Sequence, residues 1–340
     1  MMKSVATLGS HCALQLLKGA NDEKLNTILI CEKRRERLYK RFNFIDKIIL
    51  VDSFNEILKK EYSKKLDNSI LIPHGTLISQ LSSNEIESIN IPIFGNKWIL
   101  RWESDRIKKE KLLKKANIPT PKRILTPSQI CKLSIIKRDG AAGGAGYFLA
   151  SNEMEYKKKL SNLINKKTIN KNDKLYIQEY ISGVLVYLQY FYSPTKNELE
   201  FLGIDQRHES NIDGLSRIPA SNQNKINKEL TFNVIGNSPM VLRESLLDEV
   251  YSIGERFIEA SKKLVNPGII GPFCIEGVYD SNANFTAFEF SARIVAGTNV
   301  YINGSPYSAL LYNENMSMGR RIAKEIRESI SNNNLSKIIS

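Results

Sequence analysis

The sequence contains few of the residues that build disulfide frameworks or histidine metal centres. Its 340 residues include 4 cysteines and 3 histidines. Cys12, Cys31, Cys131 and Cys274 lie far apart, form no CxxC pair and sit in apolar segments, where a free thiol behaves as a small buried hydrophobe. We therefore expect structural thiols in a reducing compartment, and no histidine-rich metal centre.

Long hydrophobic runs are also missing. No apolar stretch approaches the roughly 18 residues that span a bilayer. The N-terminal segment MMKSVATLGSHCALQLLK has no cleavage-site pattern, which predicts a first strand and helix in place of a signal peptide. With a 42% apolar and 25% charged composition, the chain is expected to be a cytoplasmic globular protein without a membrane partner.

Acidic residues are outnumbered, and the formal net charge is +13. The lysines are scattered among Asn, Ile and Glu, and no aromatic residues interleave with a basic stripe as a single-strand binder requires. We expect no nucleic-acid partner. The basic charge either attracts anionic nucleotides or is a lysine-rich composition without a function.

The first part of the chain alternates short apolar strands with helical segments. At a rough 100–200 residues per domain, the length allows about two domains. Strands are predicted at 3–8, 27–31, 47–51 and 69–73, which indicates βαβ units and a parallel sheet. A basic helix should then begin at an N-cap, Ser104, and end near Asn117, before Pro119 and Pro121.

Beyond residue 122 the pattern favours hairpins. Two strands around a glycine-rich turn are predicted in IIKRDGAAGGAGYFLA, and long strands in KLYIQEYISGVLVYLQYFYS. Apolar residues at steps of three and four predict a core helix over 242–264, and a last helix is expected around 317–330. The predicted division is 1–95, an N-terminal Rossmann-like domain; 96–122, a linking helix; 123–193, a small lobe; and 194–340, a C-terminal lobe with the metal site.

The most informative segment is GPFCIEGVYDSNANFTAFEFSAR. Its strand-like runs 273–279 and 285–291 flank turn-forming residues, and a loop of 281–284 pairs Asp280 with Phe285. Glu276 then falls directly opposite Glu289. Facing carboxylates repel unless a cation lies between them, and such oxygen ligands suit magnesium or manganese. The alternative is an exposed edge hairpin without metal.

The residues around this pair complete the pattern. Alternation predicts that Phe288 and Phe290 face the core, and it returns Arg293 to the carboxylate face, where a phosphate could meet it. Lys137 ends a strand before a glycine-rich loop that could surround a triphosphate, although any flexible hairpin loop can be glycine-rich. In QEYISG a strand runs into a linker that could hydrogen-bond an adenine edge, or is simply a strand and a turn.

These pieces occur in the order found in the ATP-grasp superfamily. Over about residues 5–326 the chain also resembles the formate-dependent purine-pathway ligases typical of archaea, in TLGSHCALQLLKGA, ILIPHGTL, PIFGNKWILRWESDR, IQEYISGV, LGIDQRHESNIDGLSRIPA and FEFSARIVAGTN. The resemblance implies an ATP-grasp fold of α/β and α+β character, with an N-terminal Rossmann-like (pre-ATP-grasp) parallel-sheet domain. The small and C-terminal lobes would then form the ATP-grasp unit.

The family makes 5-formamidoimidazole-4-carboxamide ribonucleotide (FAICAR). The resemblance implies a ligase of IMP biosynthesis that joins formate to the 5-amino group of 5-aminoimidazole-4-carboxamide ribonucleotide (AICAR), with ATP converted to ADP and phosphate through formyl phosphate. It implies AICAR, formate and ATP as substrates, a magnesium or manganese cofactor, and a homo-oligomer.

The resemblance also implies residue roles. Glu276 and Glu289 would hold the metal, and Lys137 and Arg293 would be catalytic. The ATP-binding set would be Lys137, Gly143, Gly144, Gly146, Glu179, Ile181 and Glu209, and the AICAR-binding set Ser10, His11, Thr76 and Asn237, with the 5′-phosphate at the N-terminus of the first helix.

Two departures from the family pattern favour an alternative. Ala142 and Ala145 stand where the family's loop carries basic side chains, and Ser291 stands where the superfamily often has asparagine. If the alanines disable the loop, the chain is a non-catalytic or altered-specificity paralogue that binds ATP or AICAR and activates a different small carboxylate or none. No residue for formate, and no general base, is identified.

Overall fold

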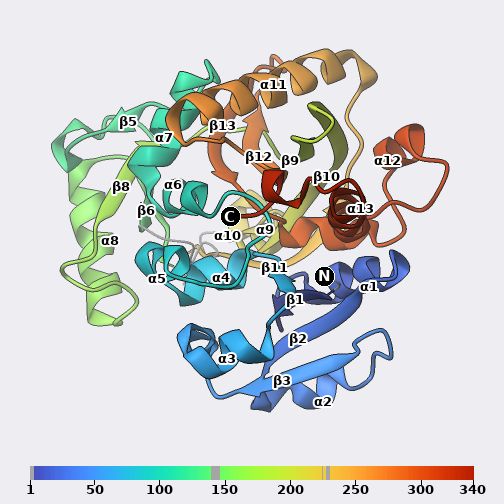
Figure 1. The fold of residues 1–340 in the computed structure, drawn as a ribbon. Helices are drawn as coiled ribbons and strands as arrows, with labels where there is room; N and C mark the ends of the chain where they lie inside the picture. The colour runs from blue at the N-terminus through green and yellow to red at the C-terminus, as the bar shows by residue number, and fades with distance from the viewer. Residues whose placement is uncertain (1–3, 139–145, 224, 227–229) are drawn as a thin grey trace.

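The computed structural model describes residues 4–138, 146–223, 225–226 and 230–340, which form three sheets with helices packed around them (Figure 1). Gly143, Gly144, Ala142 and Ala145 lie outside the described residues. Within the described ranges no helix is long and apolar enough to cross a membrane.

The N-terminal sheet is parallel, as the alternating pattern predicts, with strand order β3-β2-β1-β4. Its inner strands are buried on both faces, which explains their continuous apolar runs. Its strands are β1 (Ser4–Leu8), β2 (Asn26–Glu32), β3 (Lys47–Val51) and β4 (Ser69–Leu71). The helices of this part are α1 (Ala13–Asp22), α2 (Glu36–Tyr39), α3 (Lys60–Lys65), α4 (Gly75–Gln80) and α5 (Ser83–Glu87).

The linking segment holds two helices, α6 (Leu100–Ser104) and α7 (Arg106–Lys115). The predicted N-cap at Ser104 is wrong by one residue. Ser104 ends α6 and its hydroxyl donates to the Leu100 carbonyl, at 3.0 Å. The Asp105 side chain caps α7 by accepting from the backbone N–H groups of Ile107 and Lys108.

A small antiparallel sheet follows, with strand order β5-β8-β6-β7. The predicted hairpin is confirmed as β6 paired with β7, and α8 packs on the sheet over a small core of its own. The elements are β5 (Arg123–Ile124), β6 (Ser134–Arg138), β7 (Phe148–Ala150), α8 (Glu153–Asn165) and β8 (Leu175–Glu179).

The large antiparallel sheet has strand order β11-β10-β9-β12-β13. Because β9 pairs with both β10 and β12, this sheet spans the predicted lobe boundary at 193/194. Its elements are β9 (Val184–Ser193), β10 (Glu198–Asn211), α9 (Ile212–Leu215), α10 (Ala220–Gln223), β11 (Phe232–Pro239), α11 (Leu247–Leu264), β12 (Gly271–Tyr279), β13 (Phe285–Ser291), α12 (Pro306–Leu311) and α13 (Met318–Ser331).

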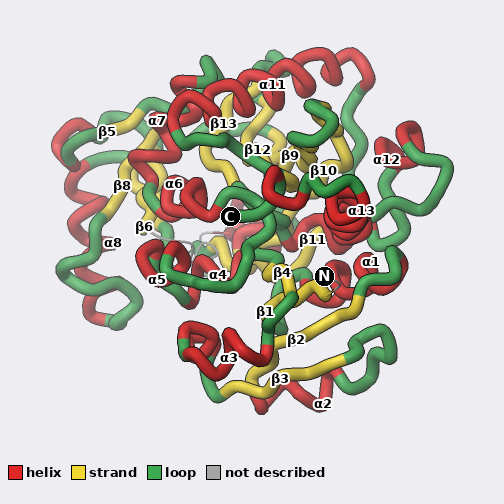
Figure 2. The backbone as a smooth tube through the Cα atoms, in the orientation of Figure 1, coloured by secondary structure: helices red, strands yellow, loops and turns green. Residues whose placement is uncertain are grey.

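The predicted core helix is confirmed as α11, which lies across one face of the large sheet (Figure 2). The ring of Phe257 stacks on Phe273 of β12, with centroids 5.2 Å apart, and meets Phe290 of β13 edge-on. Phe290 therefore faces the core as predicted. The opposite face of the sheet is left for the cavity described below.

The C-terminal helix packs against the first helix of the chain. α13 packs against α1 so closely that a Cβ on Gly19 would lie 2.2 Å from the Arg320 nitrogen, and one on Gly319 would lie 2.4 Å from the Gln15 oxygen. The loop after β1 is also tied to the segment after β13, because the Asn299 side chain donates to the His11 carbonyl at 3.2 Å.

The cysteines agree with the sequence in all but one case. All four are free thiols, and Cys12, Cys31 and Cys274 are buried. Cys131 is exposed, which corrects the expectation of a buried thiol there. It lies in the loop before β6, next to Ile130, which takes the place in the small core that the thiol does not occupy.

Candidate active site

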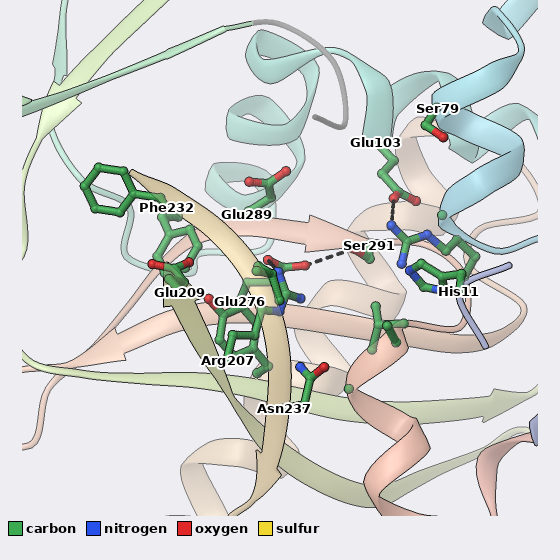
Figure 3. Close-up of a pocket in the computed structure, with 18 of the residues that line it drawn as sticks. His11, Ser79, Glu103, Arg207, Glu209, Phe232, Asn237, Glu276, Glu289 and Ser291 are labelled. Carbon is green, nitrogen blue, oxygen red and sulfur yellow. Dashed lines mark hydrogen bonds and ion pairs between the residues drawn. The ribbon is translucent and has the colours of Figure 1, made fainter. Parts of the chain in front are cut away.

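A cavity of about 400 Å³ opens where the large sheet meets the N-terminal part and the small sheet (Figure 3). Its walls come from the loop after β1, from α4, α6 and α7, from β6, from β9 to β13, and from the segment after β13. Eight predicted site residues line it together: His11, Thr76, Lys137, Glu209, Asn237, Glu276, Glu289 and Arg293.

The predicted carboxylate pair is confirmed, by a different register from the one expected. Glu276 lies opposite Glu289, but Phe285 pairs with Tyr279 and not with Asp280. The loop is one residue longer at its start because Asp280 accepts from the backbone N–H groups of Asn282 and Asn284. A bulge in β13 restores the register.

The bulge also corrects the prediction for Phe288. The extra residue breaks the in–out alternation, so Phe288 and Glu289 both line the cavity. The Phe288 ring lies under the Lys137 ammonium, 4.7 Å from Nζ to the ring centroid. This contact gives the buried lysine an aromatic wall facing the carboxylate pair.

Cations surround both glutamates. Arg207 lies 3.1 Å from Glu276, and Lys109 and Arg106 of α7 pair with Glu289. Burial alone would raise the pKa of Glu289, but Lys109, Arg106 and Lys137 outweigh it and the pKa is lowered. Glu289 is therefore ionised at neutral pH.

The donor set at the pair fits a hard divalent cation. It offers two carboxylates on facing strands, and the Ser291 hydroxyl donates to Glu276 at 3.0 Å, which orients that carboxylate. Among the described residues, no group of three or more His, Cys, Asp or Glu could hold a metal. Water and substrate phosphate would have to complete the coordination shell, as is usual for magnesium.

Lys137 is buried at the end of β6 and points toward the same carboxylates. Burial lowers its pKa to about 8, with Glu289 acting in the opposite direction and Arg106 and Lys109 adding to the decrease. Its ammonium has lost much of its water, so an anionic ligand entering the cavity would interact with it strongly.

Arg293 is held by a buried partner that the sequence did not indicate. Glu103 of α6 accepts from the Arg293 guanidinium at 2.9 Å and from the Ala292 backbone N–H at 2.8 Å. Figure 3 shows Glu103 on the same side of the cavity as His11. A Cβ at Gly75 would lie 2.7 Å from His11 Nε2 and 3.4 Å from Arg293, so glycine there leaves room for both side chains.

His11 stacks on His74, with ring centroids 5.3 Å apart and planes 2° from parallel. Nδ1 of His74 accepts from the Thr76 backbone N–H, which caps α4, so its Nε2–H donates to the Leu8 carbonyl at 2.9 Å. Burial lowers the pKa of His74 to about 4. His74, which the sequence left unassigned, is thus a neutral structural residue supporting His11.

His74 should make stability depend on pH. Its folded-state pKa of about 4 lies below the ordinary 6.5, so the unfolded chain takes up the proton first and stability is lost as pH falls below 6.5. Between pH 7 and pH 5 the free energy of unfolding should decrease in both proteins. We expect the decrease to be about 2 kcal/mol smaller in His74→Gln than in the parent. Urea unfolding at both pH values measures this, with the exposed His208→Gln as the matched control. Equal losses in the parent and His74→Gln would contradict it.

Four predicted binding residues do not line the cavity. Ser10 accepts from Arg35 at 3.0 Å, and the Glu179 carboxylate accepts from the Lys122 backbone N–H at 2.7 Å and pairs with Lys132. Gly146 precedes β7, and Ile181 lies in the linker between β8 and β9. Their roles remain predictions, as do those of Gly143 and Gly144.

Sequence reasoning missed several charged residues of the site. Arg207, Glu103, Lys109 and Arg106 lie in the cavity wall or contact residues that do. Each is a single charge on a strand or helix without a local motif. For Glu103, Arg106 and Arg207 one signal was available, because they lie within the distinctive blocks RWESDR and DQRHES.

Comparisons with known proteins find relatives over nearly the whole chain. Residues 5–124 match the model of a protein of unknown function (DUF1246), and residues 155–340 that of a domain of unknown function (DUF1297). A relative from Nitrosopumilus maritimus (strain SCM1), named 5-formaminoimidazole-4-carboxamide-1-(beta)-D-ribofuranosyl 5'-monophosphate synthetase, is 64% identical over 99% of both chains. A relative of the same name from Saccharolobus solfataricus is 46% identical over 99% of both chains.

Solved structures give the fold. The crystal structure of an IMP biosynthesis protein PurP from Thermococcus kodakaraensis superposes with a TM-score of 0.80 at 29% identity, covering 99% of this chain and 100% of that one. The ADP complex of purK, an N5-carboxyaminoimidazole ribonucleotide synthetase, has a TM-score of 0.69 at 11% identity over 96% and 77% of the two chains, which is a likeness of fold alone. The chain has the ATP-grasp fold and belongs to the family of 5-formaminoimidazole-4-carboxamide ribonucleotide synthetases.

Proposed function

We propose that this protein is a ligase that converts AICAR, formate and ATP to FAICAR, ADP and phosphate. The observation that carries the proposal is a single cavity that joins the carboxylate pair, with Lys137 and Arg293, to the predicted AICAR residues His11, Thr76 and Asn237. The names of the relatives supply the product, and the fold supports ATP as co-substrate.

In the first step a formate oxygen attacks the γ-phosphorus of ATP, and the bond from that phosphorus to the β,γ-bridging oxygen breaks to release ADP. Glu276 and Glu289 would hold a magnesium or manganese ion, which neutralises phosphate charge when it is bound. Lys137 and Arg293 add fixed positive charge from buried positions, where it is least weakened by solvent.

In the second step the 5-amino nitrogen of AICAR attacks the carbon of formyl phosphate. The carbon–oxygen bond to phosphate breaks, phosphate leaves, and the nitrogen loses a proton. His11 in the loop after β1 and Thr76 at the start of α4 would bind AICAR with Asn237. Glu179, Ile181 and Glu209 would contact ATP. The walls of the cavity would limit the access of water to the reactive intermediate.

We further propose a cytoplasmic, self-associating enzyme whose partners are these small molecules. The test is ADP release by the purified protein with magnesium, ATP and AICAR, with and without formate, and identification of the product. Release that requires both formate and AICAR is expected. Release that occurs equally with another small carboxylate would favour altered specificity, and nucleotide binding without turnover would favour the non-catalytic paralogue.

A further inference from the structure

A buried carboxylate behind the cavity wall holds two amide side chains. Asp205 of β10 is fully buried, and its two oxygens accept from Gln189 Nε2 at 2.6 Å and from Asn237 Nδ2 at 2.8 Å. A Cβ at Gly297 would lie 2.1 Å from this carboxylate, so the backbone after β13 covers it closely. Asp205 therefore has little freedom to shift.

This contact fixes which way the Asn237 amide points. An ionised carboxylate only accepts hydrogen bonds, so the NH₂ group of Asn237 must face Asp205 and its oxygen is left for the cavity. Burial raises the pKa of Asp205, while Arg207, Gln189 and Asn237 favour the ionised form. The hydrogen bonds found among the described residues include none to the Asn237 side-chain oxygen.

The place of Asn237 in the sheet indicates which substrate group it meets. It lies on β11, one edge of the large sheet, whereas Glu289 lies on β13, the opposite edge. The attacking 5-amine of AICAR must reach the activated formyl group near the carboxylate pair. The neighbouring ring substituent, the 4-carboxamide, is then the group left for Asn237.

We propose that Asp205 is a positioning residue that fixes Asn237 as a hydrogen-bond acceptor for the 4-carboxamide N–H of AICAR. Asp205 thereby makes the site select a carboxamide over the corresponding 4-carboxylate. The inference rests on the proposed function. A 4-carboxylate in that place would bring its oxygen against the Asn237 side-chain oxygen, with no hydrogen between them. A buried acceptor without a donor is costly, so the site would reject the carboxylate analogue.

The test compares AICAR with its 4-carboxylate analogue as substrate and as ligand. Asp205→Asn keeps the shape but lets the Asn237 amide turn, so the ratio of kcat/KM for carboxamide over carboxylate should fall by about tenfold or more. The KM for ATP should stay within about twofold, because Asp205 does not face the carboxylate pair. In the double variant Asp205→Asn/Asn237→Asp an acceptor again faces the cavity, and the preference should return.

A matched control separates positioning from folding. Glu325→Gln removes another buried carboxylate, which bonds Ser193 and Arg321 outside the cavity, and should leave the substrate ratio unchanged. A folded Asp205→Asn variant with the parental ratio, or with equal losses for both substrates, overturns the inference.

Failure of the proposed function would look different. If the parent protein releases no ADP with AICAR and formate, calorimetric binding of the two nucleotides replaces turnover as the readout. A parent that binds AICAR more tightly than the carboxylate, with the preference lost in Asp205→Asn, supports the inference alone. A parent that binds both equally, or neither, overturns it.

Discussion

Formate-dependent ADP release is expected to fall about a thousandfold in a Glu289→Gln variant. An amide at this position offers one neutral oxygen in place of an ionised carboxylate. In the proposed metal site, Glu276 would then be the one carboxylate of the pair left to bind a divalent cation. Without the metal the phosphate charge is less well neutralised, so the activation free energy of phosphoryl transfer rises by several kcal/mol. The measurement is steady-state ADP release at saturating magnesium.

Binding supplies an independent readout of the same change. In the presence of ADP, Mn²⁺ binding followed by electron paramagnetic resonance should weaken by at least about tenfold in Glu289→Gln. Glu110→Gln is the matched control. Glu110 belongs to α7, bonds Lys114 and Tyr176, and lies outside the main cavity, so activity should stay within about twofold. Parental activity and Mn²⁺ affinity in a folded Glu289→Gln variant would exclude the pair as the metal site.

Replacing Arg293 with methionine is expected to lower both stability and activity. The change leaves the Glu103 carboxylate buried with its ion-pair partner removed, which costs roughly 3–5 kcal/mol of the free energy of unfolding. It also removes the charge that we propose stabilises the transferring phosphoryl group, for an expected loss of about 10²–10³-fold in kcat. Chemical unfolding and ADP release measure the two effects.

A second change separates the two roles of Arg293. In the double variant Glu103→Gln/Arg293→Met the unpaired carboxylate is gone, so most of the stability should return. Activity should remain low, because the missing charge is not replaced. If the double variant regains activity together with stability, Arg293 acts through folding alone and has no part in phosphoryl transfer.

The carboxylate pair illustrates how local contacts made prediction possible. Glu276 and Glu289 lie on consecutive strands joined by a short loop, so register follows from turn chemistry and few residues. Even so, the predicted Asp280–Phe285 pair was wrong, and the right pairing of the glutamates depended on a bulge that the sequence did not signal. The same bulge turned Phe288 from the core to the cavity.

The charged residues of the cavity wall that the sequence analysis missed show where local reasoning fails. Arg207, Glu103 and Lys109 each read as an isolated charge on a solvated strand or helix face, and burial of such charges occurs only where other elements supply partners. The partners are far apart along the chain. Arg207 and Glu276 are separated by 69 residues, Lys109 and Glu289 by 180, and Glu103 and Arg293 by 190. Periodicity and turn signals carry no information over such separations.

By itself the sequence determined the parallel N-terminal sheet, the core helix α11, the facing glutamates and, through its distinctive blocks, the family. These follow from hydrophobic periodicity, short-range turns and shared sequence. Only the tertiary structure decided that His74 supports His11, that Glu103 holds Arg293, and that Asp205 orients Asn237. Each of these depends on desolvating a charged or polar group against a partner from a distant element, and that free energy exists only once the elements have packed.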